Sequence, residues 1–189
     1  MEILTIKYWD DPVLSKICDK IEDNEFGPKF EEFGWQLIAT MTAKNGIGLA
    51  APQVGVTKRM FAMTFPGLLS SAIVVCNPVI ELSGKTVPGR EGCLSLPGVY
   101  EQVYRAEIVT MQYSDPLGKQ HEVVLATPID ARIAQHETDH LDGIMFFDYK
   151  DKREQYATEA HPKPWGARMS KQLSKHVMRE WEKRKGNNG

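Results

Sequence analysis

The stretch from Thr127 to Gly143 constrains the fold most, because it predicts a helix whose buried face carries two histidines. Thr127 suits the N-cap, Pro128 suits the first turn, and Gly143 marks the end of the helix. Four residues at i, i+4, i+7 and i+11 form its core-facing stripe: Ile129, Ile133, His136 and His140. Buried imidazoles need polar partners or an ion. We therefore expect a binding site on the buried face of this helix.

The segment His136-Glu-Thr-Asp-His140 has the spacing of a metal site on a helix. Residues four apart share one helix face, so both imidazoles can reach the same ion. Glu137 lies about 100° further around the helix, where it can stand beside the ion without being a ligand. An ion that acidifies water, with an acid that takes the proton, is the machinery of a metal-dependent hydrolase. The alternative is a coincidental match on a surface helix, which the apolar stripe disfavours.

A catalytic site of this kind requires a third protein ligand. Asp142 and Asp148 follow the motif but match no known ligand spacing, and Cys93 is the stronger candidate because a glycine precedes it. The alternative for Cys93 is a buried thiol, which is the interpretation favoured for Cys18 and Cys76. Three cysteines at wide spacings make a poor disulfide framework and fit a reducing compartment.

The rest of the chain predicts an α+β protein, because its strands and helices do not alternate as βαβ units. Segments rich in β-branched and aromatic residues predict strands over 59–65, 72–76, 107–113 and 119–125. Turn-forming residues separate or follow them: Pro66-Gly67, Asn77-Pro78, Ser83-Gly84 and residues 115–118. Apolar periodicity predicts an N-terminal helix over 26–43 and a C-terminal helix over 166–185. We expect antiparallel sheets packed around the central metal-binding helix.

A chain of 189 residues suits one domain with a hydrophobic core. We assign residues 1–150 to a catalytic domain, 151–165 to a linker and 166–189 to a basic helix and tail. Eight basic residues stand against two acidic ones over 163–185, so this segment carries +6 and the other residues carry −8. That charge favours a polyanionic partner, and the alternative is a helix packed on the domain. Because the N-terminus lacks the features of a secretory signal and no apolar run approaches ~18 residues, we expect a cytoplasmic protein.

Three segments together resemble the signature motifs of the peptide deformylase family, in the family's order: Gly46-Ile-Gly-Leu-Ala-Ala-Pro-Gln53, Glu91-Gly-Cys-Leu-Ser95 and Gln135-His-Glu-Thr-Asp-His140. The resemblance implies a hydrolase that removes the N-formyl group from the formyl-methionine of newly made polypeptides and releases formate. It also implies one divalent ion per chain, expected to be Fe²⁺ in the cell. Zn²⁺, Ni²⁺ or Co²⁺ would substitute for it in preparations.

The resemblance assigns roles to individual residues. The family's metal ligands correspond to Cys93, His136 and His140. Glu137 corresponds to the acid/base, which takes a proton from the metal-bound water that attacks the formyl carbon. Gln53 corresponds to the family's glutamine, and the resemblance implies that the backbone N–H of Leu94 joins it in stabilising the oxyanion. On the residues alone, Gln53 has an alternative as a turn residue after a proline.

Substrate recognition is expected next to these motifs. Gly46 and Gly48 would let an extended formyl-peptide add as a strand. Ile47, Ile129 and Ile133 are candidates for the methionine pocket, with ordinary core packing as the alternative. The partners expected are a formyl-methionyl nascent peptide and, through the basic C-terminal helix, the ribosome, but neither DNA nor a membrane.

Some residues depart from the best-known bacterial pattern of the family. Pro97-Gly98-Val-Tyr100 and Ala131-Arg132 look more like its second bacterial and organellar branch, and Gly89 stands where many members place a larger apolar residue. The departure at Gly89 leaves the outline of the methionine pocket open. The histidine motif alone also fits a zinc endopeptidase or another amidase, and a closed site would instead indicate a structural metal or ribosome-binding module.

Overall fold

Two long antiparallel strands make up most of the sheet in the computed structural model, which describes residues 2–65 and 72–149. The five strands lie in the order of the sequence, each antiparallel to its neighbour: β1 (Gly48–Ala50), β2 (Met60–Thr64), β3 (Ala72–Cys93), β4 (Leu96–Ser114) and β5 (Gln120–Leu125). The helices are α1 (Pro28–Ala43) and α2 (Pro128–Leu141), with short 3₁₀ helices η1 (Pro12–Ser15), η2 (Ala51–Val54) and η3 (Phe146–Tyr149). The predicted α+β class is confirmed.

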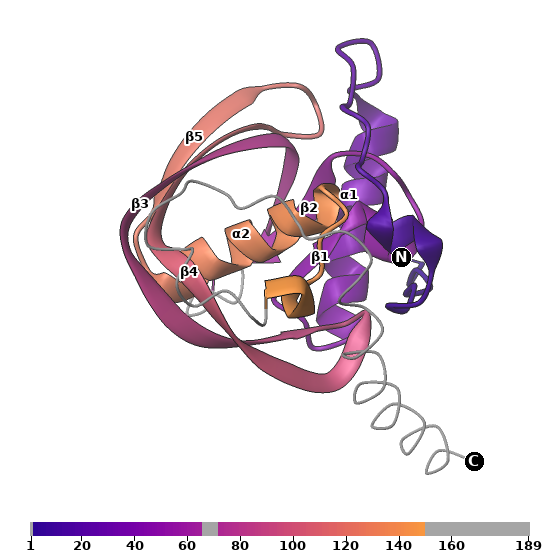
Figure 1. Cartoon of the computed structure of the whole chain (residues 1–189). Helices are drawn as coiled ribbons and strands as arrows, with labels where there is room; N and C mark the ends of the chain where they lie inside the picture. The colour runs from indigo at the N-terminus through magenta and orange to yellow at the C-terminus, as the bar shows by residue number, and fades with distance from the viewer. Residues whose placement is uncertain (1, 66–71, 150–189) are drawn as a thin grey trace, which may run out of the picture.

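Strand β3 is much longer than predicted, because two expected turns lie inside it as irregularities. Its pairing with β4 shifts register after Cys76 and again after Ser83. Asn77 and Gly84 take positive φ angles of 50° and 76° at these places, which asparagine and glycine tolerate better than other residues. Bulges of this kind bend a strand instead of ending it. Figure 1 shows β3, β4 and β5 curving around α2.

Alternating side chains of β2 supply two parts of the core, because successive residues of a strand face opposite sides of the sheet. Phe61 and Met63 belong to a cluster that includes Ala131 and Ala134 of α2. Met60 and Ala62, the alternate residues of β2, belong to a second cluster with Leu37 and Met41 of α1. The sheet is therefore covered by α2 on one face and by α1 on the other.

The predicted start and end of α2 are confirmed. The side chain of Thr127 accepts a hydrogen bond from the backbone N–H of Asp130, and Gly143 follows the helix with a φ of 71°. Every residue from Ala131 to Leu141 is buried, so the helix runs through the interior of the molecule. The N-terminal helix is also confirmed, beginning two residues later than predicted.

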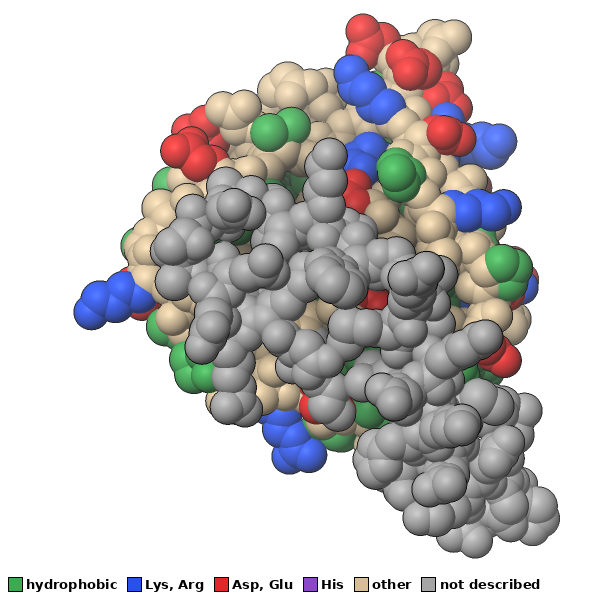
Figure 2. All heavy atoms as spheres, viewed as in Figure 1, with side chains coloured by type: hydrophobic (Ala, Val, Ile, Leu, Met, Phe, Trp, Pro, Cys, Tyr) green, Lys and Arg blue, Asp and Glu red, His purple; other side chains and the backbone are tan. Residues whose placement is uncertain are grey.

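The surface seen in Figure 2 carries acidic and basic side chains around the rim of the described part, with hydrophobic side chains in small separate groups. The helices of residues 2–65 and 72–149 all lack the length and hydropathy needed to cross a membrane. The predicted linker over 151–165 and C-terminal helix over 166–185 lie outside the described residues.

Candidate functional site

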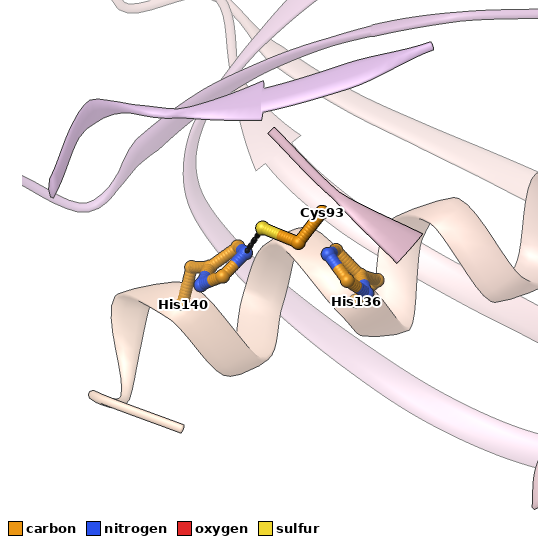
Figure 3. A group of neighbouring side chains, drawn as sticks. All are labelled: Cys93, His136 and His140. Atoms are coloured by element: carbon orange, nitrogen blue, oxygen red, sulfur yellow. Dashed lines mark hydrogen bonds between the residues drawn. The ribbon is translucent and has the colours of Figure 1, made fainter. Parts of the chain in front are cut away.

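Helix α2 and the end of β3 bring three ligand-type side chains together. The ligand atoms of Cys93, His136 and His140 all lie within 4.8 Å of one another. Figure 3 shows the thiol of Cys93, at the last residue of β3, beside two imidazoles that project from successive turns of α2. The Cys93 Sγ atom lies 3.3 Å from Nε2 of His140, and the two imidazole rings meet edge to face. The four-residue spacing of the histidines on α2 and the position of Cys93 at the end of β3 therefore bring the three ligand atoms together.

The alternative third ligands point elsewhere. The carboxylate of Asp142 forms an ion pair with Arg59 at 2.6 Å, and that of Asp148 accepts the backbone N–H of Met145 at 2.9 Å. Cys93 alone of the three candidates joins the histidines.

A buried carboxylate orients one of the imidazoles. Glu91 lies on β3 two residues before Cys93, and its Oε2 atom lies 3.0 Å from Nδ1 of His136. Such a hydrogen bond fixes the ring and leaves Nε2 free for an ion. Burial disfavours the charge on Glu91. The charge of Arg105 and the hydrogen bonds from His136 and Arg105 outweigh burial and hold its pKa well below its usual range.

Arg105 of β4 joins this carboxylate to a second one. Its Nε and Nη2 atoms donate to Glu91 at 2.9 Å and 3.0 Å, and its Nη1 atom donates to Asp139 of α2. Asp139 also accepts the hydroxyl of Tyr149 at 2.9 Å, and the guanidinium lies over that ring. Paired carboxylates and guanidinium groups of this kind can remain charged inside a protein because each compensates the other.

Gln53, on η2, connects the first motif to the ligand cluster. Its amide nitrogen donates to the Cys93 thiol at 3.1 Å and to Ser95 at 3.2 Å, while its amide oxygen accepts the backbone N–H of Ala50 at 2.8 Å. Gln53 is therefore more than a turn residue, because its buried side chain holds a hydrogen-bond donor at the sulfur.

The carboxylate of Glu137 lies against Gly48. A Cβ atom on Gly48 would come within 2.2 Å of Glu137 Oε1, so the glycine leaves the space that this acid occupies. Burial raises the pKa of Glu137 to about 7. Among the described residues, its Oε2 atom has no hydrogen-bond partner. The acid is thus available to exchange a proton with a group bound in the site.

A cavity of about 500 Å³ opens beside the ligand cluster. All but one of the residues predicted for the site line it: Gly46, Ile47, Gly48, Gln53, Cys93, Leu94, Ile129, Ile133, His136 and Glu137. His140 is the exception, and it is almost fully buried behind the cavity. Ile47 and Ile129 are exposed at 44% and 41%, whereas Ile133 is buried, so the apolar candidates extend from the surface to the interior.

These side chains fit a divalent transition metal. One thiolate with two imidazoles is a donor set that suits such ions, and three protein ligands leave a position for water or substrate. The two rings are oriented for ligation: Glu91 holds Nδ1 of His136 and so leaves Nε2 of that ring for the ion, and Nε2 of His140 faces the thiol.

Four buried charged residues around the ligands were not predicted as part of the site: Glu91, Arg105, Arg132 and Asp139. Arg132 donates to Glu91 at 2.7 Å, so all four belong to one connected group. Their signal in the sequence is weak. Arg132 and Asp139 lie on α2, and both are buried. Charged side chains are usually exposed, so the sequence alone did not suggest that these two belong to the site.

The chain is similar in sequence and in fold to proteins of one known family. A family model described as polypeptide deformylase matches residues 3–156. A peptide deformylase from Thermodesulfovibrio yellowstonii is 44% identical over 150 residues, which cover 78% of this chain and 89% of that protein. The crystal structure of a peptide deformylase from Legionella pneumophila matches with a TM-score of 0.80 and 29% identity, covering 100% of both chains. An actinonin-bound class I type b peptide deformylase from Acinetobacter baumannii matches with a TM-score of 0.74 and 36% identity, covering 80% of this chain and 100% of that one.

Proposed function

The chain belongs to the polypeptide deformylase family, and from this membership we propose how its residues divide the hydrolysis of a formyl group among them. It is a metal-dependent hydrolase that removes the N-formyl group from newly made polypeptides. The observation that carries the residue assignment is the convergence of Cys93, His136 and His140 beside the carboxylate of Glu137.

We propose that Cys93, His136 and His140 hold the ion. A divalent ion bound there supplies Lewis acidity, which polarises a carbonyl group and lowers the pKa of water toward about 7. The thiolate is a soft, strongly donating ligand that moderates this acidity. We propose Fe²⁺ as the ion in the cell, with Zn²⁺, Ni²⁺ or Co²⁺ in preparations. The thiolate would also make the site sensitive to oxidation.

Glu137 moves the proton in this proposal. Its carboxylate takes a proton from the attacking water and delivers it to the amine that leaves. Gln53 and the backbone N–H of Leu94 stabilise the negative charge that develops on the formyl oxygen. The position of Gln53 supports this assignment, because its amide nitrogen lies 3.1 Å from the Cys93 sulfur and therefore stands beside the proposed ion.

The substrate is a formyl-methionyl peptide, which we propose lies extended along β1. This strand is at the edge of the sheet, and Gly46 and Gly48 line the cavity beside it. We propose that the methionine side chain occupies the apolar part of the cavity, against Ile129 and Ile133, with Ile47 at its mouth.

Two further proposals concern the cell. The excess of basic residues over 163–185 would attract ribosomal RNA, which would place the enzyme where nascent chains emerge. A cytoplasmic location follows from that role. The residues concerned lie outside the described part of the chain, so the proposal depends on their charge alone.

The decisive experiment measures formate release from formyl-Met-Ala-Ser by protein purified anaerobically with iron. We expect Glu137→Ala to lower turnover by about 10²- to 10⁴-fold while the metal content stays unchanged. Cys93→Ser is the matched variant, and it should instead lose metal during dialysis. Near-normal turnover in Glu137→Ala would contradict its assigned role. Cleavage of an internal amide in preference to the formyl group would indicate an endopeptidase.

A further inference from the structure

Arg132 is a buried cation on α2 that has no role in the proposed mechanism. It lies four residues before His136, so both side chains share one face of the helix. Its Nη1 atom donates to Glu91 at 2.7 Å and to the backbone oxygen of Val103 at 2.9 Å. Its Nη2 atom donates to the backbone oxygen of Val87 at 3.0 Å. One guanidinium therefore joins α2 to both β3 and β4.

The two oxygens of Glu91 have different partners. Oε1 accepts hydrogen bonds from Arg132 Nη1 and Arg105 Nε, whereas Oε2 accepts one from Arg105 Nη2 and lies 3.0 Å from His136 Nδ1. Arg132 thus binds the oxygen that His136 does not use. Arg105 is shared with Asp139, so it cannot neutralise both carboxylates alone. Arg132 supplies the second positive charge, so that two guanidinium groups neutralise the two carboxylates.

Gly89 provides the space that this guanidinium needs. It pairs with Val103 across the two long strands. A Cβ atom on Gly89 would lie 2.4 Å from Cζ of Arg132 and 2.5 Å from Nε and from Nη2. The end of an arginine usually moves away from such a clash, but this one is only 7% exposed and is held by hydrogen bonds to three acceptors. Gly89 and Arg132 therefore form a sterically matched pair.

We propose that Arg132 is a positioning residue that, through Glu91, keeps the His136 imidazole aligned with the Cys93 thiol. Gly89 is required to accommodate the Arg132 guanidinium. The inference rests on the proposed role of His136 and Cys93 as metal ligands. Those ligands come from different elements, α2 and β3, and Arg132 is hydrogen-bonded to the main chain of β3 at Val87 and of β4 at Val103. Its loss should therefore loosen the ligand geometry.

The test is the affinity of the full-length, metal-free protein for Co²⁺, measured in competition with a chelator and followed by the absorption of the cobalt–thiolate bond. Arg132→Met should lower the affinity by about 10- to 100-fold, as the loss of outer partners of metal ligands does, and should shift the absorption bands. Arg132→Lys keeps the charge but not the forked geometry, so it should restore only part of the affinity. Arg59→Met is the matched control, because Arg59 also anchors α2, but through Asp142 at the C-cap and the Leu141 carbonyl and not through Glu91.

Gly89→Ala provides a second, independent measurement. It keeps every side chain of the charged group, so it tests the inference even if Arg132→Met does not fold. We expect it to lower Co²⁺ affinity in the otherwise unaltered protein but to add nothing in the Arg132→Met background, where the clash is gone. Unchanged Co²⁺ affinity in Gly89→Ala alone, or equal losses in both backgrounds, would overturn the pairing.

The controls separate this inference from the proposed function. If Cys93→Ser leaves Co²⁺ affinity unchanged, the proposed metal site itself is wrong. If Cys93→Ser lowers the affinity but Arg132→Met behaves like Arg59→Met, the metal site stands and the positioning role of Arg132 is wrong.

Discussion

The contact between Gly48 and Glu137 allows a single added methyl group to test the proposed role of Glu137 as the acid/base. In Gly48→Ala the new Cβ would lie 2.2 Å from Oε1, so the carboxylate has to move. Displacement of a catalytic group by about 1 Å can cost on the order of 10²-fold in rate. We expect a loss of that size in formate release, with metal content unchanged.

A double variant provides the control for Gly48. In a Glu137→Gln background the acid no longer functions, so Gly48→Ala should lower the residual turnover little further. A full additional loss in the double variant would mean that Gly48 acts on the substrate and not on Glu137.

The three cysteines should differ sharply toward a thiol reagent, because the thiolate is the reactive form. Burial raises the pKa of Cys18 to about 11 and that of Cys76 to about 12. Cys93 is half-buried and lines the cavity. We expect iodoacetamide to modify Cys93 first in metal-free protein and to spare it in metal-loaded protein, as measured by peptide mass spectrometry. Modification of Cys18 or Cys76 ahead of Cys93 in folded protein would contradict this.

At the residue scale, the sequence identified the side chains whose spacing is local. His136, Glu137 and His140 lie within one helix, so geometry alone brings them together. Cys93 lies some forty positions away and remained one of several candidates until the family motifs were considered. The ion pairs of Glu91 with Arg105 and Arg132 were missed, because pairing between distant residues leaves no periodic signal in a single sequence.

At the scale of elements, helices were predicted better than strands. The start of α2 was recognisable because Thr127 and Pro128 mark it chemically. The course of β3 was not, because Asn77 and Gly84 are typical of turns and only the pairing with β4 shows that they occupy bulges. A turn and a bulge both use residues that tolerate positive φ, so local composition cannot distinguish them.

The capping interaction of α2 predicts a measurable loss of stability. Thr127→Ala removes the side-chain oxygen that accepts the N–H of Asp130, which should lower the free energy of unfolding by about 1 kcal/mol. Thr42→Ala is the matched control, because its hydroxyl bonds back to the helical carbonyl of Ile38 and alanine is the better helix former. Urea unfolding should be compared at one fixed zinc concentration, since bound metal adds to stability. Equal losses in both variants would contradict a capping role.

At the scale of the whole molecule, the site depends on elements from most of the described chain. The first motif supplies Gln53 from η2, β3 supplies Cys93, and α2 supplies both histidines. Helix α2 is enclosed by the curved sheet, so its buried polar face is compensated by charged residues from β3 and β4 (Figure 1). The candidate site is therefore built into the folded core of the protein.

The basic segment near the C-terminus should be separable from catalysis. The family match ends at residue 156, and the residues placed in the site lie between 46 and 140. We expect deletion of residues 166–189 to leave formate release from formyl-Met-Ala-Ser within about twofold of the full chain, because a short substrate needs no ribosome. Loss of activity on this peptide would instead indicate that the segment packs on the catalytic domain.

Ribosome binding, unlike formate release from a short peptide, should be weakened by the same deletion. Contacts with phosphates release counterions, so affinity that depends on basic residues falls steeply with salt concentration. We expect the full chain to bind ribosomes with a strong salt dependence and the deleted chain to bind weakly with a shallow one. A full-length variant with Lys171, Lys175, Arg179 and Lys183 changed to glutamine keeps the segment but removes four charges. If its affinity and salt dependence equal those of the unaltered chain, charge attraction to ribosomal RNA is not the function of this segment.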